Sequence, residues 1–393
     1  MPRLHGGQPR TAALAGAVIA FALSLGALTA GPAMAETVGG ELLASTRRTA
    51  ILQPDAHGLP KVWAETWLLA DATTGEVLAQ KGSHVRRAPA STLKMLTALT
   101  VMPQTPPETT YVATAAAANT YGARVGLKPG RTYTLDQLWY AVFLPSANDA
   151  AIAVAQANGG VKRTVAQMNG VARDLGALDT VAKTPNGLDA PGQLSSAYDL
   201  ALIARAGMKL PEFAHYAGTT RAEFPDVKGK GSHPIYTTNR LLLHGWKGMI
   251  GVKTGFTSRA GRTYVGAATR NGRTLLVTLM GIHESSEAAA RKLLTWGFAN
   301  ADSVTPIGTL VEPGSVAPSP DAVAGPDAGA DAGTNTAQAG LPAGTATTAA
   351  SPGDEPASMP GGVLIAAAVL SALTVGTVVI ARRRSAHRGR HAA

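Results

Sequence analysis

Two uncharged apolar runs, one near each end of the chain, limit the part that can fold in water. The first, residues 11–30, follows Arg3 and Arg10 and precedes the small-residue sequence Ala33-Met34-Ala35. A positive start, an apolar middle and a small-residue site are typical of a secretory signal peptide. We therefore predict that residues 1–35 are removed. The alternative is an N-terminal membrane helix that is retained.

The second run, Val363–Ala381, carries no charge. At about 1.5 Å per residue, a helix of this length spans about 28 Å, close to the thickness of a bilayer core. Residues 382–393 contain five arginines and no acid. Because arginine stays on the cytoplasmic side, we predict a transmembrane helix with a basic cytoplasmic tail and an extracellular main domain. A removable sorting signal is the alternative, but no LPxTG-like pentapeptide precedes the helix.

Residues 311–362 consist mainly of Ala, Pro, Gly, Ser and Thr, and no apolar period repeats in them. This composition predicts a disordered tether between the membrane helix and the rest of the chain. The globular part is then residues 36–310, which hold 28 Lys and Arg against 19 Asp and Glu, a net charge of +9. A basic exterior domain favours an anionic polymer such as a cell wall as its partner. Nucleic acid is a poor alternative, because basic and aromatic residues do not interleave.

The chain contains no cysteine. Disulfides, thiol nucleophiles and thiolate metal sites are therefore excluded, although the predicted export would permit disulfides.

The order of predicted elements within residues 36–310 indicates an α+β fold. Trp67–Asp71 and Glu76–Lys81 are predicted to form one hairpin, and residues 262–270 and 273–282 a second one around Asn271-Gly272. Between them, apolar spacing predicts helices from Ser91, over 135–144, from Asp149, over 162–175 and after Ser196. A strand over 249–254 and a helix over 286–300 complete the pattern. We expect one antiparallel sheet from both ends of the domain, flanked by helices, with an inserted all-helical lobe.

Three short motifs occur in order in this domain. Ser91-x-x-Lys94 lies at a predicted helix start, Ser146-x-Asn148 follows between two predicted helices, and Lys253-Thr254-Gly255 comes last, on a predicted strand. A lone S-x-x-K occurs about once by chance in a chain of this size. The ordered set, each motif in its expected context, is characteristic of penicillin-binding proteins and class A β-lactamases.

Ser91 and Lys94 can form a nucleophile and its base. A serine hydroxyl is a weak nucleophile until a base removes its proton, and none of the three motifs contains a histidine. Lys94 lies one helical turn from Ser91, so the side chains can meet. A solvated lysine, with a pKa of about 10.4, is a poor base near neutral pH. Burial among the apolar residues at 93, 95 and 96, together with Lys253, would lower that pKa. The simpler alternative is a serine cap beside a solvated lysine.

The chain resembles the serine D-Ala-D-Ala carboxypeptidases, the low-molecular-mass penicillin-binding proteins, over roughly residues 65–301. Besides the three motifs, the resemblance rests on DATTGEVLAQK at 71–81, PAST at 89–92, MNGVARDLG at 168–176, PNGLD at 185–189, TNRLL at 238–242 and GVKTGFTSRAG at 251–261. It implies a fold like that of β-lactamases and DD-peptidases, with no metal and no organic cofactor. It also implies acyl transfer: Ser91 attacks the carbonyl between the two terminal D-alanines of a peptidoglycan stem peptide, and penicillins acylate the same serine.

The other motif residues have roles within this reaction. Ser146 can relay a proton between Lys94 and the leaving amine, and Asn148 can hold the peptide amide of the substrate; a plain turn is the alternative. Lys253 and Thr254 suit the free carboxylate of the substrate, unless Lys253 is an exposed strand lysine.

Backbone groups and nearby cations complete the expected site. Gly255 lets the substrate backbone approach closely. By resemblance, the backbone N–H groups of Ser91 and Phe256 form the oxyanion hole. Arg259 and Arg262 are further candidates for contact with the carboxylate.

Three rival functions stay open at this point. A class A β-lactamase needs a Glu-x-x-Leu-Asn loop after the second motif, but the only glutamates between that motif and Lys253 are Glu212 and Glu223, and neither starts this pattern. A DD-endopeptidase would use the same active atoms. A tethered β-lactam sensor or wall-binding module is disfavoured, because only the short tail 382–393 follows Ala381 and leaves no room for an output domain. The chain also has S-A-N where β-lactamases mostly have S-D-N, and it has the tether in place of the second β-rich domain of many relatives.

Overall fold

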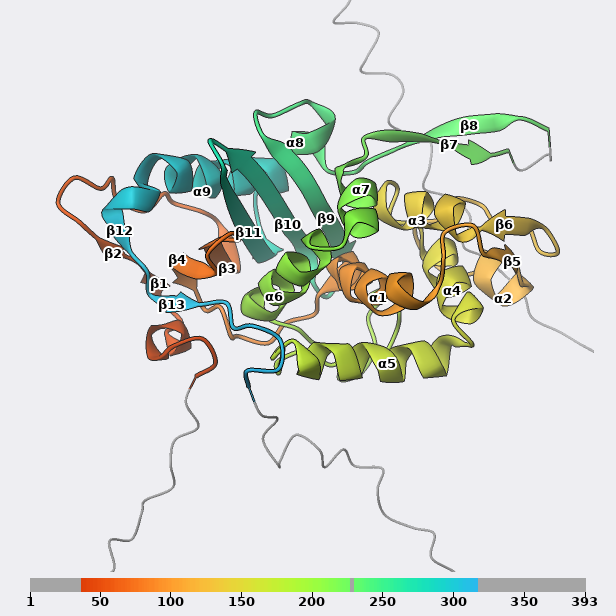
Figure 1. Cartoon of the computed structure of the whole chain (residues 1–393), viewed down its shortest axis with the longest axis horizontal. Coiled ribbons are helices and arrows are strands. Elements are labelled where there is room, and N and C mark those ends of the chain that lie inside the picture. The colour runs from red at the N-terminus through yellow and green to blue at the C-terminus, as the bar shows by residue number, and fades with distance from the viewer. Residues whose placement is uncertain (1–36, 227–229, 317–393) are drawn as a thin grey trace, which may run out of the picture. The chain divides into compact units, whose positions relative to one another are not determined.

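A computed structural model describes residues 37–226 and 230–316 (Figure 1). The predicted signal peptide, transmembrane helix and basic tail, and most of the predicted tether, lie outside the described residues. Within the described part, no helix has the length and apolar character needed to cross a membrane.

The centre of the domain is a seven-stranded antiparallel sheet in the order β1-β4-β3-β11-β10-β9, with β13 also paired to β4. The first and last parts of the domain thus supply neighbouring strands, as the sequence predicts. The bounds of these strands are β1 Arg48–Thr49, β3 Ala64–Asp71, β4 Glu76–Lys81, β9 Met249–Thr257, β10 Gly261–Arg270, β11 Arg273–Ile282 and β13 Gly308–Thr309.

Both faces of the sheet are buried, each against its own hydrophobic core. In β3, Leu68 and Ala70 belong to the core that the sheet shares with α1 and α6, whereas Trp67 and Leu69 belong to the core under α9. Because successive strand residues point to opposite faces, a strand covered on both sides must be apolar at nearly every position. The whole of β3 except Glu65 is accordingly buried.

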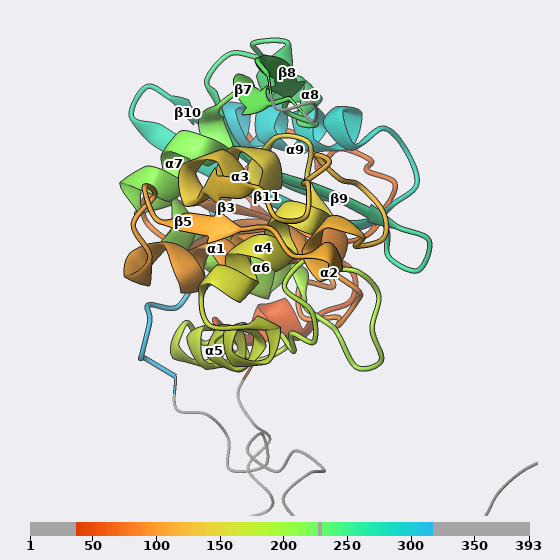
Figure 2. The ribbon, with the colours of Figure 1, turned by 90° about the vertical axis from the view of Figure 1, so that its right-hand side faces the viewer.

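Helices and short hairpins cover the sheet and form the lobe, so the prediction of an all-helical lobe is wrong in this detail: β5 and β6 pair within it. Figure 2, which views the molecule from the side of the lobe, shows α3 and α4 in front of the sheet and α5 below them. The helices are α1 Lys94–Val101, α2 Ala115–Ala118, α3 Leu135–Phe143, α4 Asn148–Ala157, α5 Val161–Asp174, α6 Ala197–Met208, α7 Pro211–Gly218, α8 Arg240–Leu243 and α9 Ser286–Asn300. The short paired strands are β2 Ile51–Leu52 with β12 Val304–Thr305, β5 Thr110–Val112 with β6 Thr132–Thr134, and β7 Arg221–Pro225 with β8 Ser232–Tyr236. Four 3-10 turns, η1 Glu41–Ala44, η2 Ala90–Leu93, η3 Met102–Gln104 and η4 Ala301–Ser303, complete the elements of the described residues.

Local sequence signals explain several of these boundaries. Thr134 and Gln137 form a capping box at the start of α3. Asn271 and Gly272, with φ angles of 50° and 80°, make the tight turn that pairs Arg270 with Arg273. Positive φ at both central residues is what a two-residue hairpin requires, so the predicted Asn-Gly hairpin is confirmed.

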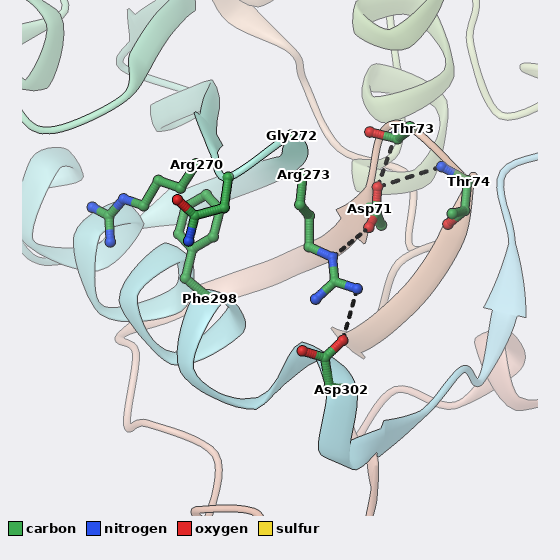
Figure 3. A pocket seen from close by; sticks show the side chains of 9 residues that line it. Asp71, Thr73, Thr74, Arg270, Gly272, Arg273, Phe298 and Asp302 are labelled. Atoms are coloured by element: carbon green, nitrogen blue, oxygen red, sulfur yellow. Dashed lines mark hydrogen bonds and ion pairs between the residues drawn. The ribbon is translucent and has the colours of Figure 1, made fainter.

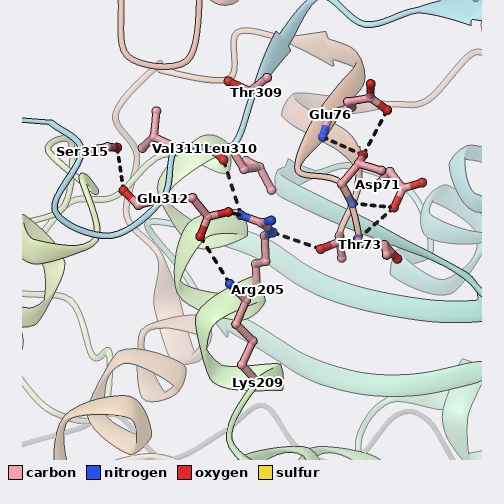
Figure 4. A network of polar contacts seen from close by, with 12 residues as sticks. Asp71, Thr73, Glu76, Arg205, Lys209, Thr309, Leu310, Val311, Glu312 and Ser315 are labelled. Atoms are coloured by element: carbon pink, nitrogen blue, oxygen red, sulfur yellow. Dashed lines mark hydrogen bonds and ion pairs between the residues drawn. The ribbon is translucent and has the colours of Figure 1, made fainter.

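The domain continues beyond the boundary at residue 310 that composition predicts. Arg205 of α6 donates to the Ala72 carbonyl at 3.0 Å and to Glu312 Oε1 at 2.6 Å (Figure 4). The Val311 N–H donates to the Tyr198 hydroxyl at 3.1 Å. Gly314 N–H likewise donates to the Asp174 carbonyl of α5. Residues 311–315 therefore belong to the folded part, as a strap held against α5 and α6.

Candidate active site

Ser91 lies on a strained turn immediately before α1. It is part of the 3-10 turn η2, and Lys94 is the first residue of α1, so the predicted helix begins with one tighter turn. The residue before the serine, Ala90, has a φ of 50°, which a residue with a side chain rarely adopts. The Pro89 carbonyl accepts hydrogen bonds from Thr92 Oγ1 at 2.6 Å and Thr263 Oγ1 at 2.9 Å. These contacts secure the turn to its own helix and to β10, which is how such strain persists.

The Lys94 amine is completely buried and has three oxygen partners. Its Nζ lies 2.8 Å from Ser91 Oγ, 2.7 Å from Asn148 Oδ1 and 2.7 Å from the Asn186 carbonyl. The two carbonyl-type oxygens can only accept, so they take two N–H bonds from the amine. The third direction faces a hydroxyl, which can either accept a third N–H or donate its proton to a nitrogen lone pair. The geometry therefore suits both the ammonium and the free amine.

The surroundings of Lys94 favour the free amine. Burial lowers the pKa of Lys94 well below its ordinary value, the positive charge of Lys253 lowers it further, and the carboxylate of Asp149 partly opposes both. The predicted neutralisation of this lysine by burial and by Lys253 thus has a structural basis.

Ser146 and Lys253 form a second buried pair. Ser146 precedes α4 with a φ of 63°, and its Oγ accepts a hydrogen bond from Lys253 Nζ at 2.9 Å. The same amine donates to the Thr254 carbonyl at 2.8 Å, and burial lowers the pKa of Lys253 to about 7. The motif alone predicts that this lysine binds the substrate carboxylate. The structure instead turns its amine toward Ser146, because Lys253 points into the domain while Thr254 lines the cleft.

A cleft with a volume of about 1040 Å³ opens over Ser91. Ser146, Asn148, Thr254, Gly255, Phe256 and Arg262 also line it, so the structure brings together most of the residues selected from the sequence. Gly255 is needed there, since a Cβ at this position would lie 2.8 Å from the backbone N of Ser91. Arg259 is exposed and is not among the lining residues.

The three motifs do not identify several residues in and around the cleft. The Asn186 carbonyl that holds Lys94 and the Arg240 side chain lie within segments that carry the family resemblance, which is the signal that could have located them. Thr238 Oγ1 lies 2.6 Å from Thr254 Oγ1 and belongs to such a segment too. Tyr121 and Gly122, on the opposite wall, have no comparable signal.

A second hollow, of about 630 Å³, lies at the turn between β10 and β11 (Figure 3). Its guanidinium group at Arg273 is paired with Asp71 at 3.1 Å and with Asp302 at 2.8 Å. It shares no lining residue with the cleft over Ser91. Because the charge of Arg273 is neutralised by these two carboxylates, the hollow offers no pair of nucleophile and base like that in the cleft over Ser91.

One group of side chains in the described part of the chain approaches metal-ligand spacing, namely His84, Asp179 and Asp199. The two ring nitrogens of His84 already contact Asp179 Oδ2 at 2.8 Å and the Val38 carbonyl at 3.0 Å. The group lies outside the cleft lining and acts as a hydrogen-bonded support.

An antiparallel sheet with a helical lobe, and a cleft in which a serine contacts a buried lysine, define the class of penicillin-recognising serine enzymes. Comparisons with known proteins identify the family within it. The sequence model described as D-alanyl-D-alanine carboxypeptidase, Peptidase S11, matches residues 53–284. The chain therefore belongs to this family of serine-type hydrolases.

Individual relatives agree with this assignment. The D-alanyl-D-alanine carboxypeptidase DacB2 of Mycobacterium tuberculosis is 41% identical over 248 residues, which are 61% of this chain and 84% of DacB2. DacA of Escherichia coli is 34% identical over 265 residues, and the match spans 64% of each protein, so about a third of DacA lies outside the match.

Solved structures confirm the α+β fold. A D-alanyl-D-alanine carboxypeptidase from M. tuberculosis H37Rv superposes with a TM-score of 0.62 at 39% identity, covering 66% of this chain and 99% of that one. The Streptomyces K15 DD-transpeptidase superposes with a TM-score of 0.59 at 29% identity, covering 62% of this chain and all of that one, 100%.

Proposed function

We propose that the protein removes the terminal D-alanine from peptidoglycan stem peptides through an acyl-enzyme on Ser91. The observation that carries this proposal is the contact of 2.8 Å between Ser91 Oγ and the buried Lys94 amine at the floor of an open cleft. Family membership supplies the reaction, and the geometry supplies the groups that perform it.

Acylation begins with the free amine of Lys94. Ser91 Oγ attacks the carbonyl carbon of the penultimate residue while its proton moves to Lys94 Nζ, which already faces the hydroxyl. The oxyanion forms between the backbone N–H groups of Ser91 and Phe256. This assignment is supported by the close approach of β9 to the serine turn, where only glycine fits at position 255. Donors held in place in this way typically supply about 3 kcal/mol of transition-state stabilisation.

The leaving D-alanine needs a proton on its nitrogen as the C–N bond breaks. Ser146 donates it and takes in return the proton that Lys94 removed from Ser91, so the Lys94 amine is free again for deacylation, while the hydrogen bond from Lys253 Nζ holds the Ser146 hydroxyl in place. Water then attacks the ester on Ser91 with Lys94 as base, which releases the shortened peptide and restores the serine. Asn148 holds the substrate amide beside Lys94.

The free carboxylate of the substrate binds at the end of the cleft formed by β9. Thr254 and Thr238 present their hydroxyls there, and Arg240 and Arg262 line the same cleft. Lys253 acts from beneath through its charge, because its amine is buried against Ser146.

The direct test is covalent labelling of the full chain with a fluorescent penicillin, followed by mass mapping of the adduct. We expect one adduct, on Ser91, that is lost in Ser91→Ala and kept in Ser258→Ala, a serine that lines the same cleft. An adduct in Ser91→Ala would overturn the assignment of the nucleophile.

Products and adduct lifetime separate the remaining alternatives. Defined muropeptides should yield free D-alanine, whereas split cross-linked dimers would indicate an endopeptidase. A penicillin adduct that turns over rapidly would indicate a β-lactamase. A labelled protein that releases no D-alanine would indicate a sensor or wall-binding module.

We further propose that the domain acts outside the cell, after removal of residues 1–35, and is anchored by residues 363–381. The apolar runs and the arginines after residue 381 support this location. N-terminal sequencing of the mature protein should begin at Glu36, and the protein should stay in the membrane fraction after a salt wash. Release of the full-length chain into the medium would contradict the anchor.

A further inference from the structure

Asp149, next to the second motif, is fully buried and is bonded by backbone N–H groups. Its Oδ1 accepts from Val125 at 3.1 Å and Ala150 at 2.9 Å, and its Oδ2 accepts from Gly126 at 2.9 Å and Leu127 at 3.0 Å. Four N–H donors match the acceptor-only character of a carboxylate. Such charge-assisted bonds are about twice as strong as neutral ones.

Three of these four bonds hold a loop that forms one wall of the cleft. The donors at 125–127 closely follow Tyr121, Gly122 and Ala123, which line the cleft opposite β9. The same loop is tied to the start of α4 by the Asn148 N–H, which donates to the Ala123 carbonyl at 2.7 Å. Asp149 is thus the anchor that fastens this wall to α4.

The anchored loop in turn orients the amide of Asn148. Asn148 Nδ2 donates to the Tyr121 carbonyl at 2.8 Å, so the other end of the amide, Oδ1, faces Lys94 Nζ at 2.7 Å. An amide that donates at one end must accept at the other, so the position of the Tyr121 carbonyl decides what Lys94 meets. A loosened loop would free the amide to turn, and an N–H group would then face the lysine.

The charge of Asp149 also reaches Lys94. The charged groups that act on this lysine are Lys253, from β9, and Asp149, from α4, and they act in opposite directions. Lys253 favours the free amine, while Asp149 favours the ammonium. The Asp149 carboxylate therefore limits how far burial and Lys253 lower the pKa of Lys94.

We propose that Asp149 is a positioning residue for acylation, which fixes the cleft wall at residues 121–127 and thereby keeps the Asn148 amide and Lys94 aimed at Ser91. This inference rests on the proposed function, in which Lys94 is the base. It adds a part to that mechanism outside the three motifs, at a residue that never touches the substrate.

The two roles of Asp149, anchor and charge, are separated by two substitutions. Asp149→Asn removes the charge and places an NH2 group against backbone N–H donors, so it disturbs both roles. Asp149→Glu keeps the charge but is longer by one methylene, so it disturbs mainly the anchor. Asp71→Asn is the matched control, because Asp71 is also a buried carboxylate that accepts backbone N–H bonds, from Thr73 and Thr74, in the separate hollow of Figure 3.

The assay is kcat/KM for release of D-alanine from a synthetic peptide ending in D-Ala-D-Ala, measured against pH on the full chain. Rates are normalised to the protein that titrates with penicillin. We expect both Asp149 variants to lose about 10- to 100-fold on the pH plateau, as when hydrogen bonds to a charged group are lost. Because removal of a negative charge favours the free amine, the acid limb of the Asn variant should move to lower pH. In the Glu variant the acid limb of the pH profile should stay at the wild-type pH. In Asp71→Asn both the position of the acid limb and the kcat/KM on the plateau should equal those of the wild type.

A purely structural role would reduce the amount of competent protein and leave the normalised plateau and limb unchanged, and that result would overturn the proposal. If the Asn variant does not fold, the Glu variant decides, since a normal plateau there would equally overturn it. Failure of the proposed function is distinct, because the wild type itself would then release no D-alanine.

Discussion

Gly187 lies against the turn that carries Ser91, and we expect its replacement by alanine to disable acylation. A Cβ at this position would lie 2.0 Å from the Ala90 carbonyl oxygen and 3.1 Å from the backbone N of Ser91. Gly187 also has a φ of 76°. Gly272 is a matched control, because its φ is 80° and a Cβ there would meet nothing within 4 Å.

The difference between the two glycines follows from these distances. A left-handed φ costs an alanine about 1–2 kcal/mol, and both variants carry this cost. Only Gly187→Ala adds the overlap: real Cβ contacts do not fall below 3.0 Å, so the Ala90 carbonyl and the new methyl must separate by about 1.0 Å. Overpacking of this kind adds about 1–3 kcal/mol. Displacement of a reacting group by about 1 Å can lower a rate about 100-fold.

The assay is the rate of acylation by a fluorescent penicillin, measured below the unfolding transition of both variants, with unfolding free energies from urea titration. We expect Gly187→Ala to lose about 2–5 kcal/mol of stability and about 100-fold in acylation rate. Gly272→Ala should lose about 1–2 kcal/mol and acylate like the wild type. Equal acylation by the two folded variants would refute the view that Gly187 shapes the nucleophile turn.

Two further predictions concern buried charges away from the cleft. Arg205→Ala should lower the free energy of unfolding by about 1.5–3 kcal/mol, because Arg205 is 8% exposed and bonds both the Ala72 carbonyl and the strap. Glu312→Gln should lower it by less than about 1 kcal/mol, since Glu312 is largely exposed. Hydrogen exchange at residues 309–312 should rise in the arginine variant, and unchanged exchange would contradict the strap contact. Burial, reinforced by Asp179, raises the pKa of Asp199 to about 7 from 3.8, so between these values the native protein keeps a proton that the unfolded chain has released. This group should therefore make stability fall as pH rises through that window, and Asp199→Asn should flatten the slope in urea titrations; identical slopes would contradict the shift.

Much of the fold can be predicted because local patterns coincide with tertiary demands. The helix predicted over 286–300 is α9, and the turn at Asn271-Gly272 joins β10 to β11. The hairpin of β7 and β8 escapes prediction, because Pro225 and Pro234 interrupt an otherwise strand-like pattern and are tolerated only at sheet edges. The strap escapes it because Glu312 finds its partner 107 residues away, which composition cannot show.

Some residues of the candidate site can likewise be predicted from the sequence, and others cannot. Ser91, Lys94 and Asn148 can be predicted because side-chain chemistry at fixed spacing is visible in a sequence. The Asn186 carbonyl and the N–H groups around Asp149 cannot, because backbone groups occur at every position and only the fold selects among them. The orientation of Lys253 also depends on a contact across the domain, with Ser146.

The most direct test of the account is a pH titration of the Lys94 amine by NMR of protein labelled with 13C at lysine Cε, with Lys94→Arg used to assign its signal. Because burial and Lys253 lower the pKa of Lys94, we expect its signal to change from ammonium to free amine at a much lower pH than the signals of exposed lysines. The arginine variant should not turn over substrate. A Lys94 signal that stays that of an ammonium up to pH 10, or normal turnover by Lys94→Arg, would contradict the central claim that a neutral lysine takes the proton of Ser91.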